Sequence, residues 1–444
     1  MTEISAHANI AESRVLVSEL ADHVGEVVLL AGWVSVARKQ KAVQFVVIRD
    51  RSGEVQLVNE RESSPGIAEV IDGLHQDSVV VAQGRVEKNE RVRLGGIEVK
   101  LESLEVLSQA EDLPLNNNSS LDVRLDWRFI DLRSPRNQLL FRVQTLVEEI
   151  FRGFCIDSGF VEINSPKLMA SPSESRSELF EVKYFDRSAY LAQSPQFYKQ
   201  MGIASGFDGV FETGPVFRAN PSFTSRHDTE FTSVDVEFAW VSSHEDVMRF
   251  EERLLAQVLG GVKERFGSQI EELFGVEVVV PSLPFPRIAH SEAISAVERT
   301  GYRIPRADGD LDPEAERRLA AAIAESQNHE FVFVTDYPSS VRPFYHMRHE
   351  ADPSLTKSFD LIWKGLEITT GAQREHRYSE LHRQVLEKGL EPEGLSFYLD
   401  FFRFGCPPHG GFGLGLTRVL MILLGLSNVR EATYLYRGPN RLTP

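Results

Sequence analysis

The first part of the chain consists of short β-rich runs separated by turn residues. The runs between Val27 and Leu107 are EVVLLAGWVSV, VQFVVIRD, EVQLVN, SVVVAQGRVEK and GIEVKLESLEVL. Within them, RDRSGEVQL predicts a hairpin turn in which Gly53 takes a positive φ. Five strands in so short a segment are typical of a small closed barrel such as the OB-fold. A fragment of a β-sandwich is the alternative.

A linker-like segment separates these runs from a longer second part. DLPLNNNSSLD (112–122) is rich in proline, asparagine and serine, which are typical of loops. After it, NQLLFRVQTLVEEIFRGFCIDSGF carries apolar residues at helical spacing and ends at Gly159, which suits a helix C-cap. FVEINSPKLM then predicts a strand that Pro166 closes.

The remaining residues alternate between strand-like and helix-like segments. We expect strands at SVDVEFAWV, FVFVTDYP and GLEITTGAQ, and amphipathic helices at HEDVMRFEERLLAQVLGGVKERF, YSELHRQVLEKGL and GLGLTRVLMILLGL. This order predicts an α+β domain on a largely antiparallel sheet. We therefore expect a barrel at 1–110, a hinge or linker at 111–135 and an α+β domain at 136–444.

Composition narrows the class of protein. Of 444 residues, 42% are hydrophobic and 25% are charged, and no apolar run approaches the ~18 residues that a membrane helix needs. The segment MTEISAHANIAESRVLVSEL lacks the features of a secretory signal, so we expect a cytoplasmic protein without a membrane span. The only two cysteines, Cys155 and Cys406, exclude a disulfide framework. A net charge of −17 argues against nonspecific coating of nucleic acid.

One segment, FRANPSFTSRHDTEFTSVDVE (217–237), combines two arginines with a regular alternation of acids and apolar residues. We expect a strand with Arg218, a loop with Arg226 and His227, and a return strand. Alternation sends Asp235 and Glu237 to one face of that strand and the valines between them to the other. The polar face lines either a ligand or, as in an exposed charged hairpin, water.

Two further segments suggest phosphate and metal chemistry, although each is a weak signal alone. GCPPHGGFGLGLTRVLMILLGL joins a glycine-rich loop to an apolar helix with Arg418 in its first turn, where a phosphate would bind. Together with the two arginines of the first segment, it suits a triphosphate. KGLEITTGAQREH offers Glu367 and Thr370 as oxygen ligands for Mg²⁺, with Arg374 just beyond.

In this order, these segments resemble the three signature motifs of class II aminoacyl-tRNA synthetases. More closely, the chain resembles the archaeal and eukaryotic type of aspartyl-tRNA synthetase. The matches span nearly its full length and include RDRSGEVQ, RLDWRFIDLRSP, AQSPQFYKQMGIASGFDGVFETGPVFRA, RPFYHM, GLEITTGAQREHRY, FYLDFFRFGCPPHGGFGLG and RLTP.

The resemblance implies an N-terminal OB-fold that grips the tRNA anticodon and a class II catalytic domain, α+β on an antiparallel sheet, that forms a homodimer through the first motif. It also implies a two-step reaction. L-Aspartate is activated by ATP with Mg²⁺, and the aspartyl group then passes to the tRNA.

The resemblance also assigns nucleotide-binding roles. Arg218 would bridge the α-phosphate and the reacting carboxylate and is the expected catalytic residue. The other implied ATP-binding residues are Asn220, Arg226, His227, Phe231, Glu367 and Arg418, with Phe231 stacking on adenine, and Glu367 and Thr370 are the implied magnesium ligands.

For the amino acid, Lys199 and Arg374 would clamp the side-chain carboxylate. Two cations for one carboxylate favour aspartate over asparagine. The other implied residues around the amino acid are Glu174, Gln196, Asp235 and Thr370. In the asparaginyl enzymes, the position of Lys199 is usually not lysine.

The implied anticodon residues are Ser35, Phe45, Arg49 and Gln56, with Phe45 stacking on a base. The family's strict anticodon readers often carry tryptophan where Ser35 stands. Ser35 therefore favours relaxed reading, in which the aspartate and the asparagine tRNAs are both charged.

Three departures from the family pattern fall on substrate-facing loops. Asn220 stands where glutamate is usual, Thr417 stands where an acid usually precedes Arg418, and Ser175-Arg176 replaces a glycine pair. Compensated drift is one interpretation, and a nucleotide site that is weakened or redirected is the other. The competing functions are a paralogue that activates aspartate or a related amino acid for another acceptor, an asparaginyl enzyme and a catalytically silent RNA-binding protein.

Overall fold

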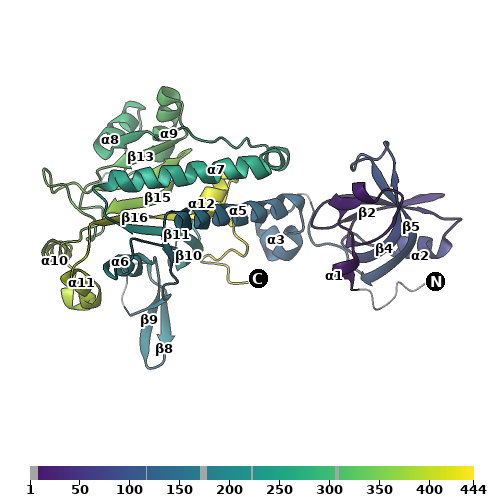
Figure 1. Cartoon of the computed structure of the whole chain (residues 1–444), viewed down its shortest axis with the longest axis horizontal. Coiled ribbons are helices and arrows are strands. Elements are labelled where there is room, and N and C mark those ends of the chain that lie inside the picture. Colours follow the sequence, from purple (N-terminus) through teal and green to yellow (C-terminus); the bar gives the residue numbers. More distant parts are fainter. Residues whose placement is uncertain (1–8, 117, 171–177, 222–223, 306–309) are drawn as a thin grey trace. The chain divides into compact units, whose positions relative to one another are not determined.

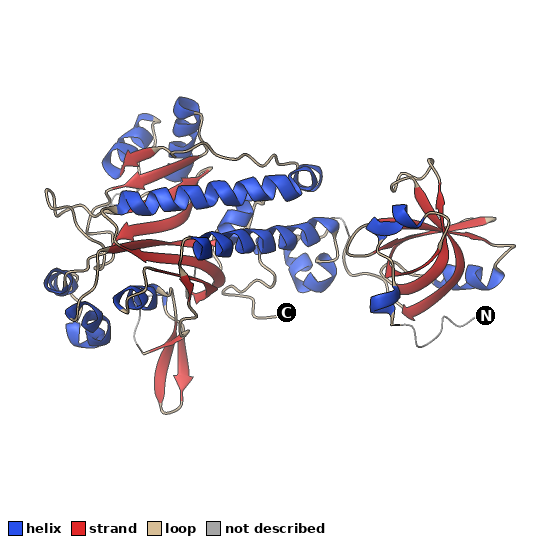
Figure 2. Cartoon of the chain, in the orientation of Figure 1, coloured by secondary structure: helices blue, strands red, loops and turns tan. Residues whose placement is uncertain are grey.

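The computed structural model describes residues 9–116, 118–170, 178–221, 224–305 and 310–444. The chain divides into two compact units, Met1–Ser119 and Ser120–Pro444. Within the described ranges, no helix is both long and apolar enough to cross a membrane. Figure 2 shows that the first unit is mainly strand, whereas the second combines a large sheet with many helices.

The first unit is a closed barrel with the strand order β1-β2-β3-β5-β4. Its strands are β1 (Val27–Lys39), β2 (Val43–Arg49), β3 (Glu54–Glu60), β4 (Val79–Lys88) and β5 (Ile97–Ser108), and its helices are α1 (Ile10–Ser13), the 3₁₀ helix η1 (Val17–His23) and α2 (Pro65–Gly73). The β3–β5 pair is parallel and the other pairs are antiparallel. The expected OB-type barrel is therefore confirmed.

Alternation along the barrel strands separates an apolar interior from an outer face. In β2, Val46 and Ile48 are buried inside the barrel, while Phe45 and Arg49 are only partly buried. The β2–β3 turn differs from the expectation, because Gly53 does not take a positive φ. Instead, the Asp50 carboxylate accepts the backbone N–H groups of Ser52 (2.7 Å) and Gly53 (3.1 Å), and these bonds close the turn.

The second unit contains an eight-stranded sheet in the order β12-β13-β14-β15-β16-β11-β10-β6. The strands are β6 (Val161–Glu162), β10 (Gly209–Phe217), β11 (Glu230–Ala239), β12 (Arg287–Ala289), β13 (Phe331–Thr335), β14 (Ser358–Trp363), β15 (Leu366–Gln373) and β16 (His409–Gly415). The two edge pairs, β12–β13 and β10–β6, are parallel, and the pairs between them are antiparallel. The largely antiparallel sheet was expected, whereas its parallel edges were not.

Two long helices, α5 (Pro135–Asp157) and α7 (His244–Phe274), lie side by side over one face of this sheet (Figure 1). Phe154 of α5 and Phe250 of α7 meet edge to face with ring centroids 5.0 Å apart. The main core contains apolar residues from both helices and from the strands, including Val234 and Val236 of β11. The other face of β11 is therefore left for polar side chains.

The GFGLG segment is a strand and not the loop that its glycines predict. It lies in β16, hydrogen-bonded between β15 and β11 at the middle of the sheet. A side chain on Gly411 would bring its Cβ within 2.0 Å of the Val236 carbonyl, and one on Gly413 within 3.0 Å of the Asp235 carboxylate. These glycines are needed because the neighbouring strand and its carboxylates approach too closely for any side chain.

The remaining elements surround the sheet. The helices are α3 (Leu121–Asp126), α4 (Arg128–Asp131), α6 (Gln196–Ala204), α8 (His290–Arg299), α9 (Pro313–Gln327), α10 (Tyr378–Glu387), η3 (Pro392–Leu395), α11 (Ser396–Arg403), α12 (Leu416–Leu423) and α13 (Val429–Ala432). A small second sheet contains β7 (Leu168–Met169), β8 (Glu181–Tyr184) and β9 (Arg187–Leu191). Ser194, which follows β9, and α6 supply residues to the cavity described next.

Candidate active site

A cavity of about 340 Å³ lies against the polar face of β11 and falls within the size range of small-molecule sites. Ser233 and Asp235 of β11 line it, so the polar face of the 217–237 segment borders a cavity. Among the described residues, the lining includes six cations and four carboxylates: Lys199, Arg218, Arg226, Arg342, Arg374 and Arg418, with Glu178, Asp228, Asp235 and Glu367.

The cavity contains a concentration of arginines around His227. Burial lowers the pKa of His227, and the charges of Arg418, Arg226 and Arg218 lower it further. The imidazole is therefore neutral near pH 7 and can donate or accept a hydrogen bond without adding charge. Three guanidinium groups around one uncharged donor form an environment suited to a polyanion such as a triphosphate.

Phe231 and Arg218 form a stacked pair beside these arginines. The Arg218 guanidinium carbon lies 5.5 Å from the centre of the Phe231 ring, and the Arg218 backbone N–H donates to the Thr229 carbonyl at 2.9 Å. Phe231, with Asn220 and the arginines, lines the cavity. The ring thus offers an apolar surface next to fixed positive charge, which suits a base joined to phosphates.

Arg418 lies near two carboxylates, although Thr417, the residue before it in the sequence, is not an acid. Arg418 Nη1 donates to the Glu367 carbonyl at 2.9 Å and lies 3.6 Å from Glu367 Oε1. The second carboxylate belongs to Asp228, whose Oδ2 accepts from Thr417 Oγ1 at 3.5 Å. Burial raises the pKa of Asp228 to about 7, against the opposing pull of the Arg418 charge. Arg418 therefore has an adjacent carboxylate, that of Glu367, although no acid precedes it in the sequence.

The oxygen groups proposed for Mg²⁺ form a sparse set. Thr370 Oγ1 lies 3.3 Å from Glu367 Oε1, and within the described part of the chain no three His, Cys, Asp or Glu side chains form a metal cluster. Burial and the nearby charge of Asp360 raise the pKa of Glu367. Asp360 Oδ1 is buried without a hydrogen-bond partner among the described residues. Paired carboxylates of this kind suit a magnesium ion that takes its other ligands from phosphate and water.

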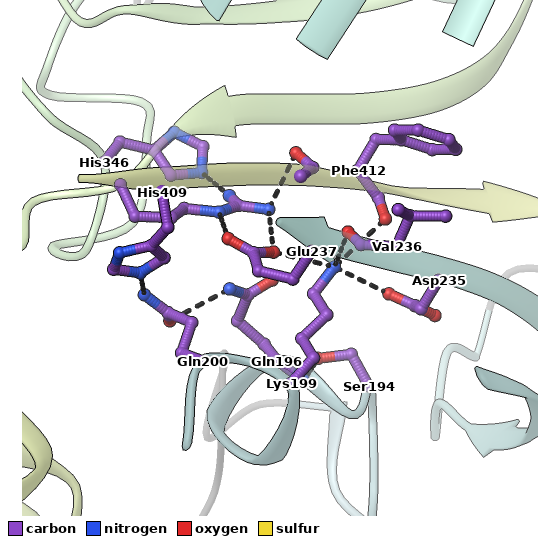
Figure 3. Close-up of polar contacts among 12 residues, drawn as sticks. Ser194, Gln196, Lys199, Gln200, Asp235, Val236, Glu237, His346, His409 and Phe412 are labelled. Atoms are coloured by element: carbon purple, nitrogen blue, oxygen red, sulfur yellow. Dashed lines mark hydrogen bonds and ion pairs between the residues drawn. The ribbon is translucent and has the colours of Figure 1, made fainter. Parts of the chain in front are cut away.

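Another part of the site pairs two buried cations with two buried carboxylates. Figure 3 shows Lys199 beside Asp235 and Glu237. Lys199 Nζ donates to Asp235 Oδ1 (2.9 Å) and to the Phe412 carbonyl (3.0 Å), and it lies 3.4 Å from Glu237 Oε2. Arg374 binds Glu237 with two hydrogen bonds of 2.9 and 3.2 Å. Lys199 and Arg374 are each 2% exposed, so both charges lie in a region of low polarisability, where they act strongly on a bound anion.

These cations set the protonation states around them. Burial alone would raise the pKa of Glu237, but Arg374 and Lys199 hold it below its ordinary value. Burial and the Arg374 charge lower the pKa of His346 well below its usual range, so its ring is neutral. His346 Nε2 therefore accepts a hydrogen bond from Arg374 Nη1 at 3.1 Å. Arg374 is fixed from two sides.

A buried network that the sequence did not predict supports Gln196. Gln196 Nε2 donates to Gln200 Oε1, as does the Tyr398 hydroxyl, both at 2.9 Å. Gln200 Nε2 lies 2.9 Å from His409 Nε2, and His409 Nδ1 lies 2.8 Å from the Pro407 carbonyl. Burial lowers the pKa of His409 to about 4, so a neutral ring donates from Nδ1 and accepts at Nε2. The i, i+4 spacing of the two glutamines was the available sequence signal.

The cavity brings together all the catalytic-unit residues expected from the sequence that the structure describes. They are Gln196, Lys199, Arg218, Asn220, Arg226, His227, Phe231, Asp235, Glu367, Thr370, Arg374 and Arg418. Glu174, Ser175 and Arg176 lie outside the described residues. The lining residues that the sequence did not predict include Asp228, Glu178, Arg342 and His346.

The four expected anticodon residues lie on the outer face of the barrel, on β1 (Ser35), β2 (Phe45 and Arg49) and β3 (Gln56). Arg49 Nη2 pairs with Asp77 at 2.5 Å, and Ser35 Oγ donates to Glu54 at 2.7 Å. Arg49 and Ser35 thus each have a hydrogen-bond partner within the barrel.

Comparison with known proteins agrees with this geometry. Residues 120–437 match the family described as tRNA synthetases class II (D, K and N), and residues 28–107 match the OB-fold nucleic acid binding domain. The aspartate–tRNA(Asp/Asn) ligase of Aeropyrum pernix is 43% identical, with 95% of this chain and 96% of the relative covered. The aspartate–tRNA(Asp) ligase of Pyrococcus abyssi is 41% identical, with 96% and 98% covered.

Among solved structures, asparaginyl-tRNA synthetase from Pyrococcus horikoshii, complexed with asparaginyl-adenylate, superposes with a TM-score of 0.90 at 33% sequence identity. The superposition covers 97% of this chain and 99% of that one. Both the sequence and the fold therefore agree with the resemblance carried by the three motifs. The chain belongs to the class II aminoacyl-tRNA synthetases, in the group of aspartate, lysine and asparagine enzymes that carry an OB-fold domain.

Proposed function

We propose that the protein is an aspartate–tRNA ligase that activates L-aspartate with ATP and transfers the aspartyl group to tRNA. The observation that carries this proposal is the pair of buried cations, Lys199 and Arg374, in the same cavity as the arginines around His227. One end of the cavity suits a small acidic side chain and the other suits a triphosphate. The names of the curated relatives, aspartate–tRNA(Asp) and aspartate–tRNA(Asp/Asn) ligases, support the same substrates.

Selection of aspartate rests on charge. The side-chain carboxylate of the substrate would accept charge-assisted hydrogen bonds from Lys199 and Arg374, whereas the amide of asparagine presents one oxygen and an NH₂ group that both cations reject. Asp235 and Glu237 hold the two cations in place and would repel any second carboxylate placed beside them. The site is therefore preorganised for one negative charge.

In the first step, an α-carboxylate oxygen of aspartate forms a bond to the α-phosphorus as the bond from that phosphorus to the pyrophosphate oxygen breaks. Arg218 stabilises the charge that builds on the α-phosphate and the attacking carboxylate. Arg226 and Arg418 hold the phosphates that leave, and neutral His227 contributes a hydrogen bond. Because these groups are fixed around the reactants, positioning and electrostatics supply most of the acceleration.

Magnesium would be held by Glu367 and Thr370. When bound, it neutralises negative charge on the pyrophosphate leaving group. In the second step, a hydroxyl of the terminal adenosine of the tRNA attacks the carbonyl carbon of the adenylate, and AMP leaves.

For tRNA selection, we propose that the outer barrel face around Phe45 and Arg49 reads the anticodon and accepts both the aspartate and the asparagine tRNA. Ser35 supports this relaxed reading because its small hydroxyl is already bonded to Glu54.

We also propose a homodimer through α5 and β6, where Ile156 and Val161 are 55% and 43% exposed. The free thiols of Cys155 and Cys406 suit a cytoplasmic enzyme.

The test is ATP–pyrophosphate exchange with each of the twenty amino acids, followed by charging of purified aspartate and asparagine tRNAs. We expect exchange with aspartate alone and charging of both tRNAs. Exchange with no amino acid would refute the ligase assignment, and exchange without charging of either tRNA would favour a paralogue that uses another acceptor.

An asparaginyl-tRNA synthetase is the second candidate, because such an enzyme from Pyrococcus horikoshii superposes on nearly the whole chain. Lys199 argues against this candidate, because its ammonium group only donates hydrogen bonds and the NH₂ group of an asparagine side chain cannot accept one. Exchange that is faster with asparagine than with aspartate would favour this second candidate.

A further inference from the structure

A buried glutamate outside the cavity lining connects two parts of the nucleotide site. Glu316 lies on α9 and is 7% exposed. Its Oε2 accepts from Arg226 Nη1 at 2.9 Å and from the backbone N–H of Glu367 at 3.1 Å. Arg226 Nη2 also donates to the Gly365 carbonyl at 3.2 Å. A single carboxylate oxygen therefore joins the arginine loop between β10 and β11 to the start of β15.

The helix that carries this carboxylate is firmly held. Asp312 caps α9 by accepting the backbone N–H groups of Glu314 and Ala315, both at 2.9 Å. Ala315, Leu319 and further apolar residues of α9 are buried in a core against β13 and β14. Glu316 therefore projects from a fixed helix, and Arg226 lies in the loop between β10 and β11. The helix therefore fixes the Glu316 carboxylate, and the carboxylate in turn positions the Arg226 guanidinium.

We propose that Glu316 is a positioning residue for ATP: it holds the Arg226 guanidinium beside Glu367, so that the arginine and the metal-binding carboxylate meet the same phosphates in fixed register. This inference rests on the proposed function. Glu316 touches no reacting atom and acts through Arg226.

The pair is compatible with a bound nucleotide. A guanidinium group has five N–H donors, and the contacts to Glu316 and Gly365 use one donor on each terminal nitrogen. Three donors remain for phosphate oxygens. If phosphate displaced Glu316, the buried carboxylate would lose its cation and the Glu367 N–H would lose its acceptor, and both losses are costly. Glu316 therefore stays paired when ATP binds.

The opposing mechanism is competition, in which Glu316 occupies Arg226 until ATP displaces it. The two mechanisms predict opposite signs for one substitution. In Glu316→Gln, the side chain keeps its shape and loses its charge. Positioning predicts weaker ATP binding because the guanidinium is held less firmly, whereas competition predicts tighter binding because the rival anion is gone.

The experiment measures ATP binding with Mg²⁺ by calorimetry, and the KM for ATP and for aspartate by pyrophosphate exchange, in the full-length protein. We expect Glu316→Gln to raise the ATP Kd and KM on the order of tenfold and to leave the aspartate KM unchanged. Glu325→Gln, the same change at an exposed position of the same helix, is the matched control and is expected to equal wild type.

A double-mutant cycle with Arg226→Ala separates positioning from general damage to the fold. If Glu316 acts only through Arg226, then Glu316→Gln has no further effect on the ATP Kd in a protein that already carries Arg226→Ala. The inference would be overturned if Glu316→Gln weakened ATP binding equally in the wild-type and Arg226→Ala backgrounds. It would also be overturned if Glu316→Gln alone left the ATP Kd unchanged or lowered it. A wild-type protein without exchange activity would instead refute the proposed function, so the two failures are distinguishable.

Discussion

Substitution of Thr417 by glutamate tests whether Asp228 already supplies the carboxylate that the family usually carries before Arg418. Thr417 Oγ1 and Asp228 Oδ2 are 3.5 Å apart, and each of the two residues is 8% exposed. If the nucleotide site were weakened by the missing acid, Thr417→Glu would strengthen ATP binding. If Asp228 takes its place, the new carboxylate instead meets an existing one.

The magnitude follows from the distance and the burial. Two like charges about 4 Å apart repel by about 4 kcal/mol at an effective dielectric constant of 20. Because the pKa of Asp228 is raised to about 7, a proton on Asp228 relieves this repulsion freely below pH 7, whereas keeping that proton at pH 8 costs about 1.4 kcal/mol. We therefore expect Thr417→Glu to raise the ATP KM at pH 8 by roughly tenfold, which corresponds to about 1.4 kcal/mol.

The assay is ATP–pyrophosphate exchange at pH 6 and pH 8. Thr417→Val, which removes the hydroxyl without adding charge, is the control and is expected to change the ATP KM little. The double variant Asp228→Asn with Thr417→Glu exchanges the positions of the acid and the neutral group, and it is expected to return the ATP KM toward wild type. An ATP KM for Thr417→Glu at or below the wild-type value at pH 8, or a double variant no better than the single one, would contradict this reasoning.

Two further predictions concern buried charges. Lys199→Met is expected to reduce exchange with aspartate by more than a hundredfold with the ATP Kd unchanged, because Asp235 then lies unpaired beside a substrate carboxylate that keeps only Arg374; an aspartate KM near the wild-type value would contradict the assigned carboxylate clamp. Glu251, on α7, is fully buried, and burial raises its pKa to about 8. The folded state therefore holds a proton that the unfolded state releases near pH 4.5, and wild-type stability falls as pH rises between these values. The Tm advantage of Glu251→Gln over wild type is expected to grow from pH 5 to pH 8.5, and a difference independent of pH would refute the assignment.

The sequence determined those features that depend on periodicity along one segment. Alternation along β11 predicted that Asp235 and Glu237 share a face and that the valines between them face the core, because side chains in a strand point to opposite faces in turn. Five β-rich runs separated by turn residues predicted the barrel. The resemblance to the class II synthetase motifs implied which arginines and acids belong to one site, and these residues line one cavity.

Only the tertiary structure decided the partners of these residues. The glycine-rich segment reads as a loop because local propensity does not show that two neighbouring strands and the Asp235 carboxylate leave no room for side chains. The contact of Glu316 with Arg226 joins residues 90 positions apart, and that of Asp228 with Thr417 joins residues 189 apart. No local pattern encodes such contacts, because they depend on how separate elements pack. The sequence by itself thus determined the charges that the site contains, and tertiary packing decided which of them are paired.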